Sequence, residues 1–597
     1  DRGETWTAIS PDLTTNRAEW QKQAESGGLT PDVSGAENFT TIIAIAPSPK
    51  QQGVLWAGTD DGRLHVTQDG GKTWTSVEGN LRGVPANTWI PHVAPSPHDA
   101  GTAFVVLDDH RRSNWTPYVQ KTTDFGKTWT SLATKNLRGY ALAIVQDPVD
   151  PDLLFLGTEF GLWFSTDGGK GWMPWRHGVP TVSVMDLVIH PREHDLVIAT
   201  HGRGLYVIDD IRPLRSLSDD TQKKPLHVYE IADAQQYRVA QTGGARFPGN
   251  GEYRGESRPY GALITYSLNA PGLPHPDQEK ERERKEAERA KAARTPEAAA
   301  EAPKPTPAEL EAAQRTSEGK VAPKPPAEGE DEGRRGRKPE AEIQILDGSG
   351  KVIRTFKKPA VQGVNRAVWD LKTDAFKRAP SRRPPTEGEE IFRAQGGPEV
   401  LPGTYKVRVK YGQQQEEGTV RVVADPRFPA NDGARKANFE AQQRAGALQD
   451  TTVAALERIV KTRQDLDTLT AQLRKQDEDA KKAGSTEANK DLLADARKLQ
   501  KKLNDLEGRL RQPENPKGLV AETDVLSKIN YAQRSISSSW DAPTPAQLAY
   551  LGEAEQDLRK ALADLNRLYA EDVPAFRAKV KDSDLRLLGE GASIEVK

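Results

Sequence analysis

An eight-residue pattern, S/T-x-D-x-G-x-T/G-W, recurs in the first third of the chain and restricts the fold more than any other feature. Its full copies are Thr67–Trp74, Thr122–Trp129 and Ser165–Trp172, and Asp1–Trp6 carries the end of a fourth. Successive tryptophans are 68, 55 and 43 residues apart. That spacing suits one four-stranded sheet plus its loops per repeat, so the repeat predicts a series of similar sheets.

Each fixed position of the pattern has a physical role. The Asp carboxylate can accept hydrogen bonds from its own turn, the Gly can adopt a positive φ, and the Trp supplies a large apolar surface. A calcium site would need more oxygen ligands than the motif supplies, so neither a metal nor a cofactor is predicted. The predicted structural residues are Asp69, Gly71, Trp74, Asp124, Gly126, Trp129, Asp167, Gly169 and Trp172.

Short apolar runs precede each motif and predict the strands of each sheet. The runs at 42–47 and 54–58, for example, are punctuated by Pro47 and by Asp60-Asp61-Gly62. Similar runs recur at 141–145 with 153–157, and at 184–189 with 196–199. Each repeat is therefore predicted to contain an inner strand, a second strand, a charged turn, a third strand, the Asp turn and an outer strand.

The repeated turn resembles the Asp-box of BNR-repeat β-propellers, a group that includes sialidases, xyloglucanases and the sortilin-type Vps10 domain. Ala199–Ile211 resembles the closing segment of large bacterial secreted proteins described as BNR-repeat glycosyl hydrolase or sortilin-like. The resemblance covers most of the chain and implies an extracellular or periplasmic protein, but it places no catalytic residues here. Because Asp1 lies inside a motif, we interpret the sequence as a C-terminal fragment with any further blades before Asp1.

One face of the predicted propeller is the expected binding face. Antiparallel strands place the second-to-third turns at the end opposite the Asp turns, together with the links 80–83 and 136–139. Candidate catalytic acids on this face are Asp60, Asp61, Asp108, Asp109 and Glu159. Candidate ligand-binding residues are Arg63, Trp89, His110, Arg111, His201 and Arg203, and the aromatic residues to inspect also include Trp115 and Tyr118.

Three functions fit these residues. The first is recognition of a peptide, protein or glycan on that face. The second is hydrolysis of a polysaccharide, which requires two carboxylates about 5–5.5 Å or 6.5–9.5 Å apart. The third is a structural role in assembly. No H-E-x-x-H, P-loop, G-x-S-x-G or C-x-x-C motif occurs, so the sequence points to no metalloprotease, nucleotide or serine-hydrolase site.

Three further regions follow the predicted propeller of residues 1–212. Short strands at 226–270 and 341–426 predict an Ig-like β-sandwich. The charged, proline-rich segment 271–340 has few large apolar residues, so it is predicted to be disordered apart from a charged helix near Gln278 to Arg294.

Residues 433–597 predict an antiparallel helical bundle. Leucine and isoleucine recur every three to four residues in four stretches, with Thr544 as an N-cap and Pro545 at the first helical position of the last. Leu548 begins the apolar stripe of that stretch. Self-association through this region is the alternative to an intramolecular bundle.

Composition limits the partners and the chemistry. The 597 residues carry 84 basic and 86 acidic side chains, a net charge of −2, so no general attraction to nucleic acid is expected. Cysteine is absent, which excludes disulfides and thiolate catalysis. No run of 18 apolar residues occurs, so no transmembrane helix is predicted.

Overall fold

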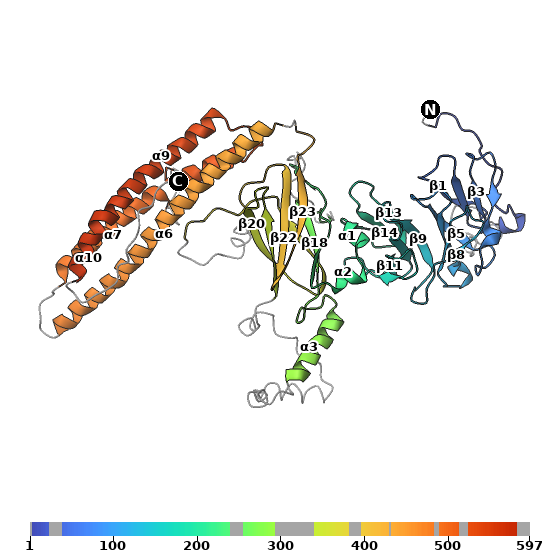
Figure 1. Cartoon of the computed structure of the whole chain (residues 1–597), viewed down its shortest axis with the longest axis horizontal. Helices are drawn as coiled ribbons and strands as arrows, with labels where there is room; N and C mark the ends of the chain where they lie inside the picture. Colours follow the sequence, from blue (N-terminus) through green and yellow to red (C-terminus); the bar gives the residue numbers. More distant parts are fainter. Residues whose placement is uncertain are drawn as a thin grey trace. The chain divides into compact units, whose positions relative to one another are not determined.

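The computed structural model of the chain (Figure 1) forms two compact units. Unit 1 contains residues 1–230, 267–272 and 362–364, and unit 2 contains the remainder. The structure describes residues 3–22, 39–238, 255–292, 339–380, 396–428, 431–482, 489–512 and 523–581.

Unit 1 consists mainly of four antiparallel sheets whose strand order follows the chain. The inner strands β1, β5, β9 and β13 contact one another in succession, as the inner strands of propeller blades do. The predicted class, mainly β with propeller-type sheets and C-terminal helices, is confirmed. The strands are β1 (Ile42–Pro47), β2 (Leu55–Thr59), β3 (Leu64–Thr67), β4 (Thr75–Ser76), β5 (Trp89–Pro95), β6 (Ala103–Asp108), β7 (Tyr118–Thr122), β8 (Thr130–Ser131), β9 (Ala141–Gln146), β10 (Leu154–Thr158), β11 (Gly161–Ser165), β12 (Met173–Pro174), β13 (Val184–Ile189), β14 (Leu196–Thr200) and β15 (Leu205–Ile208).

The second strands of the first three sheets are apolar along nearly their whole length because nearly all of their residues are buried. Strand β6 has the sequence AFVVLD, and all six of its residues are buried. Trp56, Phe104 and Phe155 occupy equivalent second strands and are fully buried. Burial on two faces favours a continuous apolar run over alternation.

Neighbouring sheets pack through the glycine of each Asp-containing turn. Gly126 lies against Val77, and Gly169 lies against Leu132, each residue coming from the outer part of the preceding sheet. Gly71 of the first sheet lies against Ile9 in the same way. Ile9 therefore packs against the Asp-turn glycine of the first sheet, as Val77 and Leu132 pack against those of the second and third sheets.

Unit 2 contains a five-stranded sheet of order β17-β23-β22-β19-β20, in which only the β17–β23 pair is parallel. Strands β18 and β21 are neighbours in a smaller sheet, and Trp369 of β21 meets Tyr405 of β22 at 5.4 Å between ring centroids. The sandwich boundaries stay predictions. Strand β16 (Leu226–Val228) belongs to unit 1. The strands that follow it are β17 (Ala234–Gln235), β18 (Ala262–Leu268), β19 (Glu340–Leu346), β20 (Val352–Pro359), β21 (Gly363–Trp369), β22 (Gly403–Tyr411) and β23 (Gln414–Val423).

The C-terminal helices share one core of leucine, isoleucine and alanine side chains. Thr544 caps α9 in a capping box with Gln547, and Pro545 is its first residue, as the sequence predicts. Leu548, the first residue of the predicted apolar stripe, is 41% exposed, so the buried part of that stripe starts at Leu551, one turn further on. The helices are α1 (Arg212–Arg215), α2 (Asp219–Lys223), α3 (Gln278–Ala292), α6 (Asp432–Lys482), α7 (Lys490–Leu510), α8 (Val525–Ile536), α9 (Pro545–Arg567) and α10 (Val573–Lys581), with a π-helical turn at Leu568–Asp572 and short 3-10 turns at Ala18–Trp20, Glu78–Asn80 and His110–Arg112.

The predicted disordered insert is described only in part. Its charged helix is present as α3, close to the predicted bounds. The rest of the insert, from residue 293 to residue 338, lies outside the described residues.

Candidate functional site

The two ends of each blade sheet carry different turns. The backbone N–H of Asp60, in the β2–β3 turn, donates to the Thr41 carbonyl beside the start of β1 at 3.1 Å. At the other end, the N–H of Gly70 in the Asp turn donates to the Gly53 carbonyl of the β1–β2 turn at 2.9 Å. The charged tips and the Asp turns therefore lie at opposite ends of the sheets.

The links between sheets contact both kinds of turn. The Val77 N–H, just after β4, donates to the Leu64 carbonyl at 2.9 Å, and Glu78 pairs with Arg63 of the charged turn, so the first link begins beside the charged turn of its own sheet. Asn80 Nδ2 and Asn136 Nδ2 donate to the Gly126 and Trp172 carbonyls of the next Asp turns at 2.9 and 2.6 Å. At the end of the second link, a Cβ on Gly139 would lie 2.8 Å from Glu159 of the next charged turn.

A cavity of about 230 Å³ lies between the tips of the first two blade sheets. The β2–β3 turn contributes Asp60, and the end of β6 and the loop after it contribute Asp108 and Asp109. The segment before β1 contributes aromatic side chains. Five of the residues singled out from the sequence meet here. The lining residues are Trp20, Phe39, Asp60, Asn87, Trp89, Asp108, Asp109, Arg111 and Arg112.

Arg111 lies over the ring of Trp89, with its guanidinium carbon 3.1 Å from the ring centroid. Burial lowers the pKa of Arg111, while the charges of Asp108 and Asp60 act in the opposite direction. The guanidinium therefore lies within the field of two carboxylates from different sheets. Stacking on an indole holds its plane in one orientation, as a recognition group requires.

Asp60 is an acid of this cavity whose pKa is altered by its surroundings. Burial raises its pKa, and the nearby charge of Asp61 adds to this effect, although the N–H of Thr41 donates to its Oδ1 at 2.7 Å and opposes the rise. Asp60 therefore holds its proton to a higher pH than an exposed aspartate does.

The adjacent acids are engaged in holding loops. Asp61 is fully buried and accepts hydrogen bonds from the Thr15 N–H at 2.7 Å and from the Thr59 hydroxyl. Asp109 pairs with Arg112 at 2.5 Å and accepts from Asn114 Nδ2 at 2.8 Å. Both carboxylates thus serve loop structure, which makes them poor candidates for chemistry.

Three aromatic rings form a platform beside the cavity. His110 stacks on Tyr140 with centroids 4.4 Å apart and planes 15° from parallel, and Trp115 lies 5.9 Å from Tyr140. Asp108 holds His110 through a 2.7 Å contact to Nδ1. Burial raises the pKa of Tyr140, and the charge of Glu159 adds to this, so Glu159 lies near the same platform.

The remaining predicted ligand residues do not line the cavity. Arg63 pairs with Glu78 at 2.5 Å and so stabilises its own sheet. His201 and Arg203 are exposed at the tip of the fourth sheet. Tyr118 accepts a hydrogen bond from Asn114 at 2.8 Å and helps to shape the loop after β6.

Sequence reasoning missed the aromatic wall and Asn87. Trp20 and Phe39 pack at 5.6 Å between centroids, but they belong to a stretch without repeat or period. A Cβ on Gly62 would lie 2.5 Å from the Asn87 backbone, so this close approach places Asn87 at the cavity. Gly62 could be recognised in the sequence as a turn residue after Asp60 and Asp61. No feature of the sequence showed that Asn87 packs against it.

Among the described residues, no three His, Asp or Glu side chains gather as a metal site would require. Within the same part of the chain, every helix is too short or too polar to cross a bilayer.

Comparisons with known proteins find no matching family model and no matching curated protein. Among solved structures, the Niastella koreensis GH74 enzyme is 22% identical over 28% of this chain and 28% of that one, with a TM-score of 0.24. The GH74 xyloglucanase from Xanthomonas campestris is 21% identical over 32% of each chain, with a TM-score of 0.25. YCF48 bound to D1 peptide is 19% identical over 28% of this chain and 52% of that one, with a TM-score of 0.23. The chain thus spans about half or less of these proteins, and similarities of this size assign no function.

Proposed function

We propose that this is a ligand-binding propeller protein of the sortilin-like BNR-repeat type, which captures a glycan or peptide at the cavity between its first two blade sheets. The observation that carries the proposal is the oriented Arg111, stacked on Trp89 in a cavity that also holds Asp60 and Asp108. A few polar groups placed among aromatic walls are typical of small-ligand sites.

The ligand chemistry follows from these groups. Hydroxyl or amide donors of the ligand would bond to the carboxylates, and ligand oxygens would accept from Arg111. At about 230 Å³ the cavity suits one sugar ring or one large side chain of a longer ligand. Trp115, 54% exposed on the adjacent platform, would pack against the next ring or side chain along that ligand.

A glycan and peptide array, probed with the full chain, tests the proposal and separates the two ligand types. For a bound ligand, Trp89→Ala and Arg111→Lys are expected to raise Kd by about tenfold or more, because each removes a central contact. His201→Ala and Arg203→Gln, on the fourth sheet, are matched controls expected to leave Kd unchanged. Equal Kd values for all four variants, each shown to be folded by circular dichroism, would refute the site.

Hydrolysis of a polysaccharide is the second candidate, and the raised pKa of Asp60 favours it. A glycosidase needs one carboxyl group that keeps its proton and a second that is ionised. Asp60 fits the acid role, and Asp108, which lines the same cavity, is the candidate for the second carboxylate. Asp60→Asn and Asp108→Asn should then each abolish release of reducing sugar, whereas Asp61→Asn should act through stability alone. Retained turnover in a folded Asp60→Asn protein excludes this function.

We also propose that the protein is exported to the periplasm or the medium, because its repeats and Ala199–Ile211 resemble those of secreted BNR proteins. Immunodetection of the protein in cell fractions tests this location. Recovery only with cytoplasmic markers would contradict it.

A further inference from the structure

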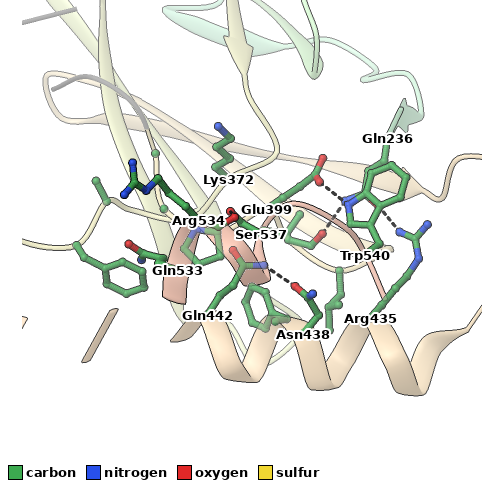
Figure 2. A pocket seen from close by; sticks show the side chains of 18 of the residues that line it. Gln236, Lys372, Glu399, Arg435, Asn438, Gln442, Gln533, Arg534, Ser537 and Trp540 are labelled. Atoms are coloured by element: carbon green, nitrogen blue, oxygen red, sulfur yellow. Dashed lines mark hydrogen bonds between the residues drawn. The ribbon is translucent and has the colours of Figure 1, made fainter. Parts of the chain in front are cut away.

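A second cleft, of about 650 Å³, lies wholly within unit 2 between loops of the β-sheets and the helices α6 and α8 (Figure 2). Lys372 and Glu399 come from the sheet side, Arg435 from α6, and Arg534 from α8. None of these residues belongs to a motif that the sequence analysis singled out. The volume is in the range of ligand pockets.

The lining of this cleft is strongly unbalanced in charge. Its described lining residues include five cations and a single carboxylate, that of Glu399, whereas the whole chain is close to neutral. The five cations are Arg238, Lys372, Arg378, Arg435 and Arg534.

Glu399 is engaged by neutral donors. Trp540 Nε1 donates to its Oε2 at 2.9 Å, and the Tyr260 hydroxyl donates to its Oε1. Burial and this hydrogen bond raise the pKa of Tyr260, so the phenol keeps the proton that it donates. Glu399 therefore serves to position the Trp540 indole, which Figure 2 shows in the cleft beside it.

Arg435 is the most informative of the cations because it is only 6% exposed. Its Nη1 donates to Gln236 Oε1 at 3.0 Å, and its guanidinium lies 4.5 Å from the centroid of Trp540, so both neighbours are uncharged. Its Nη2 is buried and finds no acceptor in the described part of the chain. Buried guanidinium groups are normally paired with an anion, because an unpaired buried charge is strongly unfavourable.

The floor of the cleft is rigid. Asn438 Nδ2 donates to the carbonyl oxygens of Ile536, Ser539 and Asp541 at 3.0, 3.2 and 2.8 Å, which fixes the segment after α8 onto α6. The backbones of α6 and of the end of α8, which carry Arg435 and Arg534, are therefore joined, and such preorganisation lowers the entropy cost of binding.

We propose that this cleft binds an acidic peptide segment, with one carboxylate held by Arg435 and further carboxylates held by Lys372 and Arg534. In Figure 2, Arg435 and Arg534 lie at opposite ends of the labelled group, and Lys372 comes from the opposing wall. Because Lys372, Arg435 and Arg534 come from three separate elements, a chain with spaced carboxylates can present one carboxylate to each. The aromatic side chains of the lining, Trp540 among them, contact the apolar parts of such a peptide.

Calorimetric titration of the full chain with a hexaglutamate peptide at low salt tests this assignment. Lys372→Gln and Arg534→Gln are each expected to raise Kd about tenfold, because each removes one charge-assisted hydrogen bond to the peptide. Neither side chain is buried, so both variants should fold. Lys436→Gln is the matched control, because Lys436 is an exposed cation of α6 outside the cleft lining. Affinity should also fall as salt is raised.

Hexalysine and citrate complete the experiment. Hexalysine should not bind, and citrate should bind much more weakly than hexaglutamate. The proposal is overturned if hexaglutamate does not bind, or if its Kd is the same in the Lys372, Arg534 and Lys436 variants. Citrate binding as tightly as the peptide would overturn the peptide assignment in favour of a small polycarboxylate.

Discussion

Single aspartate side chains stabilise the repeated turns, and this contribution to stability depends on pH. Asp69 accepts from the Thr73 hydroxyl at 2.7 Å and from the Thr73 N–H at 2.9 Å, and these bonds, together with that from Thr67, lower its pKa to about 2. A carboxyl whose pKa is depressed by folding stabilises the protein above its unfolded pKa, and this contribution is lost as pH falls through the folded value. The melting temperature of Asp69→Asn should therefore lie below that of the wild type at pH 5, and the gap should close between pH 4 and pH 2. Thermal unfolding followed by circular dichroism measures it, and a gap independent of pH would contradict the assignment.

The first full Asp turn contains two adjacent glycines that contribute to the structure in different ways. Gly70 and Gly71 both have positive φ, +73° and +96°, but a Cβ on Gly70 meets nothing within 4 Å, whereas one on Gly71 would lie 2.6 Å from the Ile9 carbonyl oxygen. Gly70→Ala is expected to cost about 1 kcal/mol from backbone strain alone. Gly71→Ala is expected to cost about 2 kcal/mol more, because the Ile9 segment must move. Urea denaturation of the two variants gives the comparison, and equal losses would show that the glycine does not act as a packing contact between sheets.

Across unit 1 as a whole, β1 of the first sheet and the strands of the fourth sheet leave apolar side chains exposed. Ile45 of β1 is 72% exposed and Leu205 of β15 is 71% exposed, and Val188 and Val207 of the fourth sheet are also more than half exposed. Contiguous apolar surface of this kind favours association in water. The chain should therefore show concentration-dependent association in sedimentation velocity, reduced in the Ile45→Thr/Leu205→Thr double variant. Val149→Thr, an equally conservative change at an isolated exposed valine, is the control and should have no effect. Association unchanged by the double variant would place the contact elsewhere, such as in the helical region.

The sequence by itself determined the local elements of this protein. Turn residues at fixed offsets and apolar runs of strand length placed the blade strands, and Thr544-Pro545 placed the start of α9, because hydrogen bonding within a few residues decides these features. It also pointed to the charged tips as one end of the sheets.

Only the tertiary structure decided which of those tips line a cavity. Asp60 and Asp61 are adjacent and chemically identical, yet the first lines a cavity with Arg111 and the second is fully buried against Thr15. The difference depends on how neighbouring sheets are spaced and on which distant segment covers them. The same holds for the cleft of unit 2, where Gln236, Glu399 and Trp540 meet although no local pattern relates them. Side chains hundreds of residues apart share a site because packing of sheets and helices brings them together, and that packing is a property of the whole fold.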